Sequence, residues 1–337
     1  MKILVPGGAG YIGSHTCVEL LNAGYEVAVV DNYANSSPRV FPRIERITGK
    51  APHVHEADIG DEDALSRIFE MEKPDAVIHF AGLKSAPGSV AAPLAYYTNN
   101  LSGTITLFRV MEAFHVKKIV FSSSACVYGN MEHIPLREEE PTAPLNPYGQ
   151  IKLMTERIMA DLCAADISYA AVALRYFNPI GAHPSGLIGE DPLGEPGNLA
   201  PRILQAAIGK TPYLTVTGTD FPTPDGTGVR DYLHVVDLAR GHVKALEYLT
   251  THSGFLAVNL GTGRGTSVME LLHAFERAAG HAIPYKNFPR RDGDAPQYWA
   301  DPSLAQELFS WRAELSIDDM CRDAWRWQSH NPNGYAG

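Results

Sequence analysis

The sequence predicts an α/β protein in which a doubly wound parallel sheet is followed by a second, smaller α/β domain. Up to about residue 175, short β-branched runs alternate with longer amphipathic segments, which is typical of βαβ units. After Asn178 the pattern changes to Gly- and Pro-rich loops between short elements. The predicted strands of the first part are Ile3–Val5, Val27–Val30, Ala76–Phe80 and Ile119–Ser122.

This change of pattern places a domain boundary near residue 176. The prediction is a sheet domain over residues 1–176 and a substrate-binding domain over residues 177–337. Two apolar stretches in the second part, Tyr232–Val236 and Ala257–Leu260, have the composition of strands or helices. We therefore expect segments between residues 232 and 262 to return to the first domain.

Composition excludes several classes of partner. The net charge of −10 is spread along the chain without a Lys/Arg cluster, so nucleic acid and anionic membrane surfaces are poor partners. No apolar run approaches the roughly 18 residues that span a bilayer, and no secretory signal precedes Pro6. The four cysteines form no CxxC pair, which suits a reducing compartment. We expect a cytoplasmic protein.

A glycine-rich stretch, Gly7-x-x-Gly10-x-x-Gly13, lies between the first strand and a helix predicted over Tyr11 to Asn22. Glycines allow a tight turn, and the helix N-terminus offers N–H groups to a pyrophosphate. Asp31 ends the second strand, where it can accept hydrogen bonds from ribose hydroxyls and repel the extra phosphate of NADP. The sequence therefore predicts a Rossmann-type fold with NAD as cofactor. Pro6, which cannot donate a hydrogen bond, has no explanation at this level.

Tyr148 and Lys152 lie one turn apart on the same face of a helix that opens after Asn146-Pro147. The pKa of tyrosine is ordinarily about 10, so Tyr148 needs Lys152 and the positive nicotinamide ring to favour its charged form. Ser124 follows a predicted strand at the carboxyl edge of the sheet, where such sheets bind ligands. These residues predict a catalytic proton shuttle in which Ser124 bonds the reacting oxygen.

The order of Gly7-x-x-Gly10-x-x-Gly13, Asp31, Asp58-Ile59, Ser122-Ser123-Ser124 and Tyr148-x-x-x-Lys152 resembles the extended short-chain dehydrogenase/reductase superfamily. Further segments resemble the UDP-galactose (UDP-glucose) 4-epimerase family in particular, over nearly the whole chain. These segments are His79–Lys84, Leu174–Pro179, Gly226–Tyr232 and Arg290–Asp294.

The resemblance implies the site residues one by one. Its catalytic residues are Tyr148, Lys152 and Ser124. The implied NAD contacts are Gly7, Gly10, Tyr11, Ile12, Gly13, Asp31, Asn32, Asn35, Ser36, Asp58, Ile59, Phe80, Ala81, Gly82, Lys84, Asn99, Ser124, Tyr148, Lys152 and Phe177. The implied substrate contacts are Lys84, Ser124, Tyr148, Asn178, Asn198, Leu199, Thr215, Val216, Thr217, Arg230, Arg291, Asp294 and Tyr298. Two arginines suit a diphosphate because guanidinium groups bind such oxygens bidentately.

The mechanism that the resemblance implies is redox-neutral and makes the protein an isomerase of galactose metabolism. Tyr148 takes the C4 hydroxyl proton, hydride passes to bound NAD, the 4-keto sugar turns, and hydride returns to its other face. Tyr298 matches a position that is bulky in members that exclude N-acetylated sugars. UDP-galactose and UDP-glucose are therefore the expected substrates.

Several positions depart from the family pattern: Pro87-Gly88, Cys126, Gln150-Ile151 and Thr217. None replaces one of the three catalytic groups. They bear on turnover and nucleotide affinity more than on the type of reaction.

Two alternatives remain open beside this interpretation: a 4-epimerase of another UDP-sugar, either a UDP-N-acetylhexosamine or a UDP-pentose, and a non-catalytic NAD-binding protein. A 4,6-dehydratase is disfavoured because the acid and base that elimination needs are replaced by Ala125 and Cys126. No metal is expected, since His53-x-His55 belongs to no HExxH motif or ligand cluster.

Residues 93–114 predict a helix with two apolar stripes, one for the sheet and one for a second copy of the chain. We therefore expect a homodimer. The first stripe comprises Leu94, Tyr97, Leu101, Phe108 and Met111, and the second comprises Gly103, Leu107, Val110 and Phe114.

Overall fold

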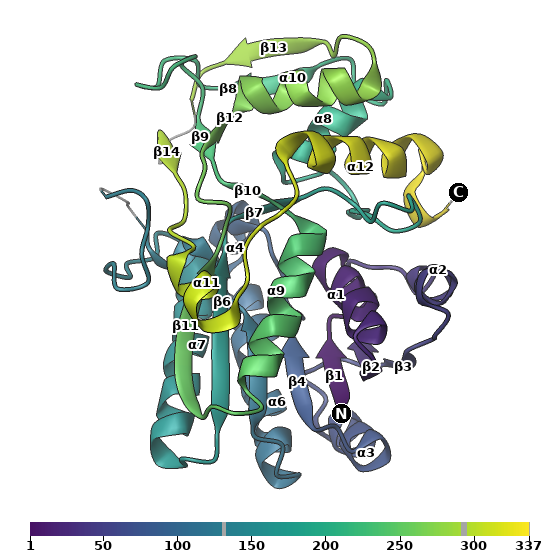
Figure 1. Cartoon of the computed structure of the whole chain (residues 1–337), viewed down its shortest axis with the longest axis vertical. Coiled ribbons are helices and arrows are strands. Elements are labelled where there is room, and N and C mark those ends of the chain that lie inside the picture. Colours follow the sequence, from purple (N-terminus) through teal and green to yellow (C-terminus); the bar gives the residue numbers. More distant parts are fainter. Residues whose placement is uncertain (130–132, 291–294, 337) are drawn as a thin grey trace.

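The computed structural model describes residues 1–129, 133–290 and 295–336 and has two lobes (Figure 1). Within this described part, the larger lobe is built on a seven-stranded sheet in the order β11-β6-β5-β4-β1-β2-β3, with every neighbouring pair parallel. The predicted doubly wound parallel sheet is thereby confirmed. Its strands are β1 (Lys2–Pro6), β2 (Glu26–Asp31), β3 (His53–Glu56), β4 (Ala76–His79), β5 (Lys118–Ser122), β6 (Ala170–Tyr176) and β11 (Gly254–Leu260).

Both faces of this sheet are covered by helices, which explains why its strands are nearly continuous apolar runs. Along β1, Ile3 and Val5 pack on one face and Leu4 on the other, because successive side chains alternate. The first face carries α1 (Tyr11–Asn22), α2 (Val40–Thr48), α9 (Val235–Tyr248) and α11 (Ser303–Phe309). The second face carries α3 (Glu62–Glu72), α6 (Gly103–Ala113) and α7 (Pro147–Ala165).

The smaller lobe lies beyond the carboxyl ends of the strands and has its own apolar cluster (Figure 1). Its helices are α8 (Leu199–Ala207), α10 (Val268–Ala279) and α12 (Ile317–His330). Its short strands pair as β7 (Asn178–Ile180) with β10 (Tyr232–His234), β8 (Leu214–Thr217) with β13 (Tyr285–Phe288), and β9 (Val229–Arg230) with both β12 (Thr266–Ser267) and β14 (Gln297–Tyr298).

The chain passes between the lobes more than once. After β10 in the smaller lobe it enters α9, which packs along α1, and then β11, which pairs with β6 at the edge of the large sheet. Strand order reverses between β1 and β4, since β2 and β3 lie on one side of β1 and the later strands on the other. The crevice at such a switch point is where open α/β sheets bind ligands.

The helix predicted over residues 93–114 is present, but it contains a π-helical turn that the sequence did not indicate. It runs without a break through α5 (Pro93–Tyr96), η1 (Tyr97–Ser102) and α6, and the short helix α4 (Ala86–Ala91) precedes it. The π-turn shifts the helical phase, so neither predicted apolar stripe continues along one face of the helix from end to end. Leu107, Val110 and Met111 are buried beneath the sheet face, whereas Leu94 is 80% exposed.

Candidate functional site

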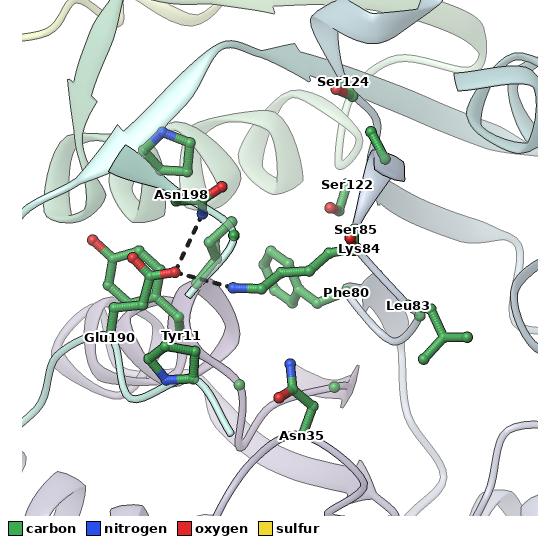
Figure 2. Close-up of a pocket in the computed structure, with 18 of the residues that line it drawn as sticks. Tyr11, Asn35, Phe80, Leu83, Lys84, Ser85, Ser122, Ser124, Glu190 and Asn198 are labelled. Carbon is green, nitrogen blue, oxygen red and sulfur yellow. Dashed lines mark hydrogen bonds and ion pairs between the residues drawn. The ribbon is translucent and has the colours of Figure 1, made fainter. Parts of the chain in front are cut away.

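A cavity of about 550 Å³ opens at the carboxyl edge of the sheet, between the two lobes. Its lining comes from the β1–α1 turn, from the ends of β4 and β5, from the start of α7, and from α8, β8 and β9 of the smaller lobe. Figure 2 shows side chains from both lobes around this space, with Tyr11 and Glu190 facing Lys84 and Phe80. The cavity therefore occupies the switch-point crevice of the sheet.

Backbone geometry at the β1–α1 turn requires glycine. Gly7 has a φ of +81°, and a Cβ added to it would lie 2.5 Å from the backbone nitrogen of Ala81. A Cβ on Gly13 would lie 2.3 Å from the carbonyl oxygen of Gly7. Gly10 caps α1 without any side-chain hydrogen bond, so the first-turn N–H groups have no helical acceptor and suit an anion.

Pro6 has a structural explanation at the end of β1. Its carbonyl oxygen accepts from the N–H groups of both Phe80 (2.9 Å) and Ala81 (3.0 Å). The next N–H along the chain, that of Gly7, reaches the carbonyl of Val30 at 2.8 Å. The residues around Pro6 therefore keep β1 joined to both neighbouring strands without an N–H at this position.

Asp31 is buried at the end of β2 and faces the glycine turn. Its Oδ2 accepts from the N–H of Ala9 at 3.0 Å, and its Oδ1 accepts from Tyr33 N–H at 3.0 Å and the Ser36 hydroxyl at 2.8 Å. These bonds fix the carboxylate while leaving acceptor capacity toward the cavity. Farther along this rim, Asp58 accepts from the Asn32 amide at 2.7 Å.

Helix α7 begins immediately before Tyr148 because two signals coincide there. Asn146 caps the helix by accepting from the N–H of Gly149 at 2.9 Å, and Pro147 occupies the first helical position. The N–H of Tyr148 donates to the hydroxyl of Ser89 at 3.1 Å. The start of α7 is thereby held against the segment that follows β4.

Ser124, Tyr148 and Lys152 all line the cavity. The ammonium of Lys152 donates to the carbonyl of Ser122 at 2.5 Å and lies 5.5 Å from the centre of the Tyr148 ring. Burial lowers the pKa of Lys152 to about 8. The ammonium of Lys152 is thus hydrogen-bonded to the last residue of β5, two residues before Ser124.

Burial dominates the electrostatics of Tyr148. Burial is the largest influence and raises the pKa of Tyr148 well above its ordinary value, with smaller contributions from Cys126 and Tyr176 in the same direction. A hydrogen bond with Ser124 acts in the opposite direction. The ammonium of Lys152 is hydrogen-bonded to the Ser122 carbonyl rather than to the Tyr148 hydroxyl.

A buried ion pair behind these residues was not identified from the sequence. Glu156, one turn after Lys152 on α7, accepts from Arg175 of β6 at 2.6 Å and from the Ser123 hydroxyl at 2.5 Å. Arg175 also donates to the Tyr128 hydroxyl at 3.1 Å. The sequence offered one signal for this pair: Glu156 lies four residues after Lys152, on the same face of the predicted helix. The network joins α7 to β5 and β6 beside Ser124.

The smaller lobe presents a second helix N-terminus to the cavity. Asn198 occupies the cap position of α8 but makes no side-chain capping bond, and both Asn198 and Leu199 line the cavity. Arg230 lines it from β9, with its guanidinium 4.5 Å from the centre of the Tyr298 ring. The buried Oδ1 of Asn178 has no hydrogen-bond partner among the described residues.

Most residues predicted for the site are brought together. Tyr298 does not line the cavity, but its ring packs on two residues that do, Arg230 and Phe177. Arg291 and Asp294 lie outside the described residues. The predicted residues that line the cavity are Gly7, Gly10, Tyr11, Ile12, Gly13, Asp31, Asn32, Asn35, Ser36, Asp58, Ile59, Phe80, Ala81, Gly82, Lys84, Asn99, Ser124, Tyr148, Lys152, Phe177, Asn178, Asn198, Leu199, Thr215, Val216, Thr217 and Arg230.

The structure places three of the departures from the family pattern. The N–H of Cys126 donates to the Ser124 hydroxyl at 3.2 Å, and both Cys126 and Thr217 line the cavity. Pro87 lies in the first turn of α4, where a helix needs no N–H donor. Lining residues that the sequence did not suggest include Leu83, Ser85, Glu190, Arg202, Phe221 and Tyr335.

Neither a metal cluster nor a membrane span is found where side chains are described. Over residues 1–129, 133–290 and 295–336, no three His, Cys, Asp or Glu side chains are grouped to hold an ion. No helix in those ranges has the length and apolar character to cross a bilayer.

Comparison with known proteins identifies the family. The model of the NAD dependent epimerase/dehydratase family matches residues 3–261. The chain belongs to this family. It is 56% identical over 335 residues to a UDP-glucose 4-epimerase of Bacillus subtilis, covering 99% of each chain. It is 53% identical over 341 residues to the human UDP-glucose 4-epimerase, covering 99% of this chain and 98% of the human protein.

Solved structures agree with this membership. The UDP-glucose 4-epimerase of Bifidobacterium longum, crystallised with NAD+ and UDP, superposes with a TM-score of 0.96 at 52% identity, covering 99% of this chain and 100% of that one.

Replacing Arg175 by Met tests the ion pair behind the site. The variant leaves Glu156 buried without its cationic partner, so we expect the free energy of unfolding to fall by about 3–5 kcal/mol. Urea denaturation measures this change. Arg157→Met, on the exposed side of the same helix, should change stability by only about 0.5 kcal/mol. Equal small losses in both variants would show that the pair does not hold the helix.

Proposed function

We propose that this protein is a UDP-glucose 4-epimerase that interconverts UDP-galactose and UDP-glucose with bound NAD. One observation carries the proposal. The cavity lined by Ser124, Tyr148 and Lys152 is also lined by the N-termini of α1 and α8, and both helices begin without a side-chain cap. A reaction that holds a dinucleotide and a nucleotide sugar together needs two anion sites flanking one reactive centre. Full-length identity above 50% to proteins of this name supports the assignment.

The residues at the β1–α1 turn fit NAD. The N-terminus of α1 is available to its pyrophosphate, and the fixed carboxylate of Asp31 is available to its adenosine ribose. The same negative charge opposes a 2′-phosphate, so NAD is favoured over NADP. NAD held there would supply a reversible hydride acceptor for C4 of the sugar, without net consumption of the cofactor.

Tyr148 and Ser124 are the groups that we assign to the C4 oxygen. Ser124 donates a hydrogen bond to that oxygen, and Tyr148 removes its proton and later returns it. Because burial raises the pKa of Tyr148, the phenol needs positive charge nearby to act as a base at neutral pH. We assign that charge to the ammonium of Lys152 and to the nicotinamide ring.

The UDP portion fits the smaller lobe. We assign its diphosphate to the N-terminus of α8 and to Arg230, with Arg291 and Asp294 as further contacts that follow from the sequence. The remaining proposed contacts are Lys84, Asn178, Asn198, Leu199, Thr215, Val216 and Thr217, together with Tyr298 behind Arg230. Strong contacts to the nucleotide and few to the hexose would let the 4-keto sugar turn between its two faces.

The direct test is to incubate the purified protein with UDP-galactose, and separately with UDP-N-acetylgalactosamine, and to follow inversion at C4 by proton NMR. We expect UDP-glucose to form from the first, and little product from the second if the Tyr298 ring limits the sugar pocket. Inertness toward both, with NAD supplied, would contradict the proposed function. Inversion of the acetylated sugar alone would reassign the substrate.

Tyr148→Phe should retain NAD while kcat falls by a factor of about 10²–10⁴, because the variant removes the group that transfers the proton. The control is Tyr213→Phe, whose ring stacks on Phe288 outside the cavity. Its kcat should be unchanged. Normal turnover by the Tyr148 variant would refute the assignment of the proton shuttle.

We also propose the division of the chain into residues 1–176 and 177–337, with residues 232–262 returning in part to the first domain. The packing of α9 on α1 and the pairing of β11 with β6 support this division. A cytoplasmic location is proposed as well, and the free thiols of Cys17, Cys126, Cys163 and Cys321 support it, since disulfides are rare in reducing compartments.

We propose a homodimer formed through the helices that follow β4. Three apolar side chains are exposed on this segment: Leu94 on α5, Ile105 on α6, and Phe114 at the end of α6. Leu94→Lys should shift the sedimentation coefficient from dimer toward monomer at micromolar protein. Tyr285→Lys, an exposed position on β13 of the other lobe, should leave the dimer intact. A monomeric parent protein would remove this proposal.

A further inference from the structure

Glu190 lies where the two halves of the cavity meet. Its Oε1 accepts from the ammonium of Lys84 at 3.1 Å and from the side-chain amide of Asn198 at 3.3 Å (Figure 2). Lys84 follows β4 in the large lobe, and Asn198 caps α8 in the smaller lobe. A single carboxylate oxygen therefore joins one residue assigned to both ligands with one assigned to UDP.

The backbone around Glu190 is fixed by the C-terminal part of the chain. The indole of Trp327 on α12 donates to the Glu190 carbonyl at 3.2 Å. The neighbouring Asp191 accepts from the N–H of Tyr335 at 2.8 Å, and the N–H of Gly189 donates to the Tyr335 hydroxyl at 3.2 Å. A Cβ on Gly189 would lie only 2.3 Å from the Trp327 ring. The position of the Glu190 side chain is thus built into the fold.

The two partners of Glu190 differ in how firmly they are otherwise held. The Glu190 side chain is 10% exposed and that of Lys84 is 48% exposed, so Lys84 has freedom that the carboxylate restricts. Asn198 leaves its own helix uncapped and turns its amide toward Glu190. This orientation keeps the N–H groups of α8 available to a ligand, whereas an asparagine at this position ordinarily accepts from them.

We propose that Glu190 is a positioning residue that strengthens the binding of both ligands. It holds the ammonium of Lys84 on the cofactor side of the cavity, and it turns the Asn198 side chain away from the first N–H groups of α8. This inference rests on the proposed function. It predicts that loss of the Glu190 charge weakens NAD and UDP binding together, with much less effect on the chemical step. The opposite effect, tighter binding of the two anions, would follow if Glu190 acted only by repelling phosphate.

Glu190→Gln keeps the size of the side chain and removes its charge. We expect the dissociation constants for NADH, measured by fluorescence, and for UDP, measured by calorimetry, each to rise by about tenfold. The KM for UDP-galactose should rise in parallel while kcat changes by less than about threefold. Glu195→Gln, an exposed carboxylate on the same segment, is the matched control and should change none of these values. Unchanged or tighter binding in Glu190→Gln would overturn the inference.

A double-mutant cycle separates positioning from a general structural role. If Glu190 acts through Lys84, NADH binding in the double variant Lys84→Met/Glu190→Gln should be weakened by less than the product of the two single effects. Additive losses would overturn the inference. Because NADH and UDP binding are measured without turnover, these outcomes remain distinct from a failure of the epimerase assignment, which would appear as an inactive parent protein that still binds both.

Discussion

The buried ion pair between Glu156 and Arg175 is the interaction on which the geometry of the site depends. It joins three elements, since Glu156 belongs to α7, Arg175 to β6, and the Ser123 hydroxyl that also reaches Glu156 follows β5. Burying two charges is favourable only when each is well paired and hydrogen-bonded. Here both charges have several hydrogen-bond partners. The pair therefore holds α7, which carries Tyr148 and Lys152, against Ser123, the neighbour of Ser124.

From this fixed point the two ligand sites follow from the topology. Parallel strands present their carboxyl ends to the same crevice, and the reversal of strand order opens it between β1 and β4. The N-terminus of α1 enters it from the sheet lobe and that of α8 from the smaller lobe. Glu190 joins the two lobes at this crevice by accepting from Lys84 of the larger lobe and from Asn198 at the start of α8. The reactive centre is therefore combined with two helix N-termini that can bind anions.

Sequence patterns were sufficient for features that depend on local chemistry. The alternation of apolar runs located β1, β2, β4 and β5, and the Asn146-Pro147 signal located the start of α7. The π-turn at Tyr97–Ser102 was missed because an inserted residue changes helical phase without changing composition. The Glu156–Arg175 pair and Glu190 were missed because each depends on contacts between elements distant in sequence. The burial of Tyr148, which raises its pKa, could not be seen in the sequence for the same reason, since burial is a property of the folded chain.

If the epimerase chemistry proposed here is right, the C4 hydrogen of the sugar leaves as hydride and returns to the same carbon without exchange with water. The direct measurement uses UDP-galactose deuterated at C4, with analysis of the UDP-glucose formed by NMR and mass spectrometry. We expect the deuterium to be retained at C4 of the product. Replacement of that deuterium by solvent hydrogen would show that C4 loses a proton instead, and would refute hydride transfer.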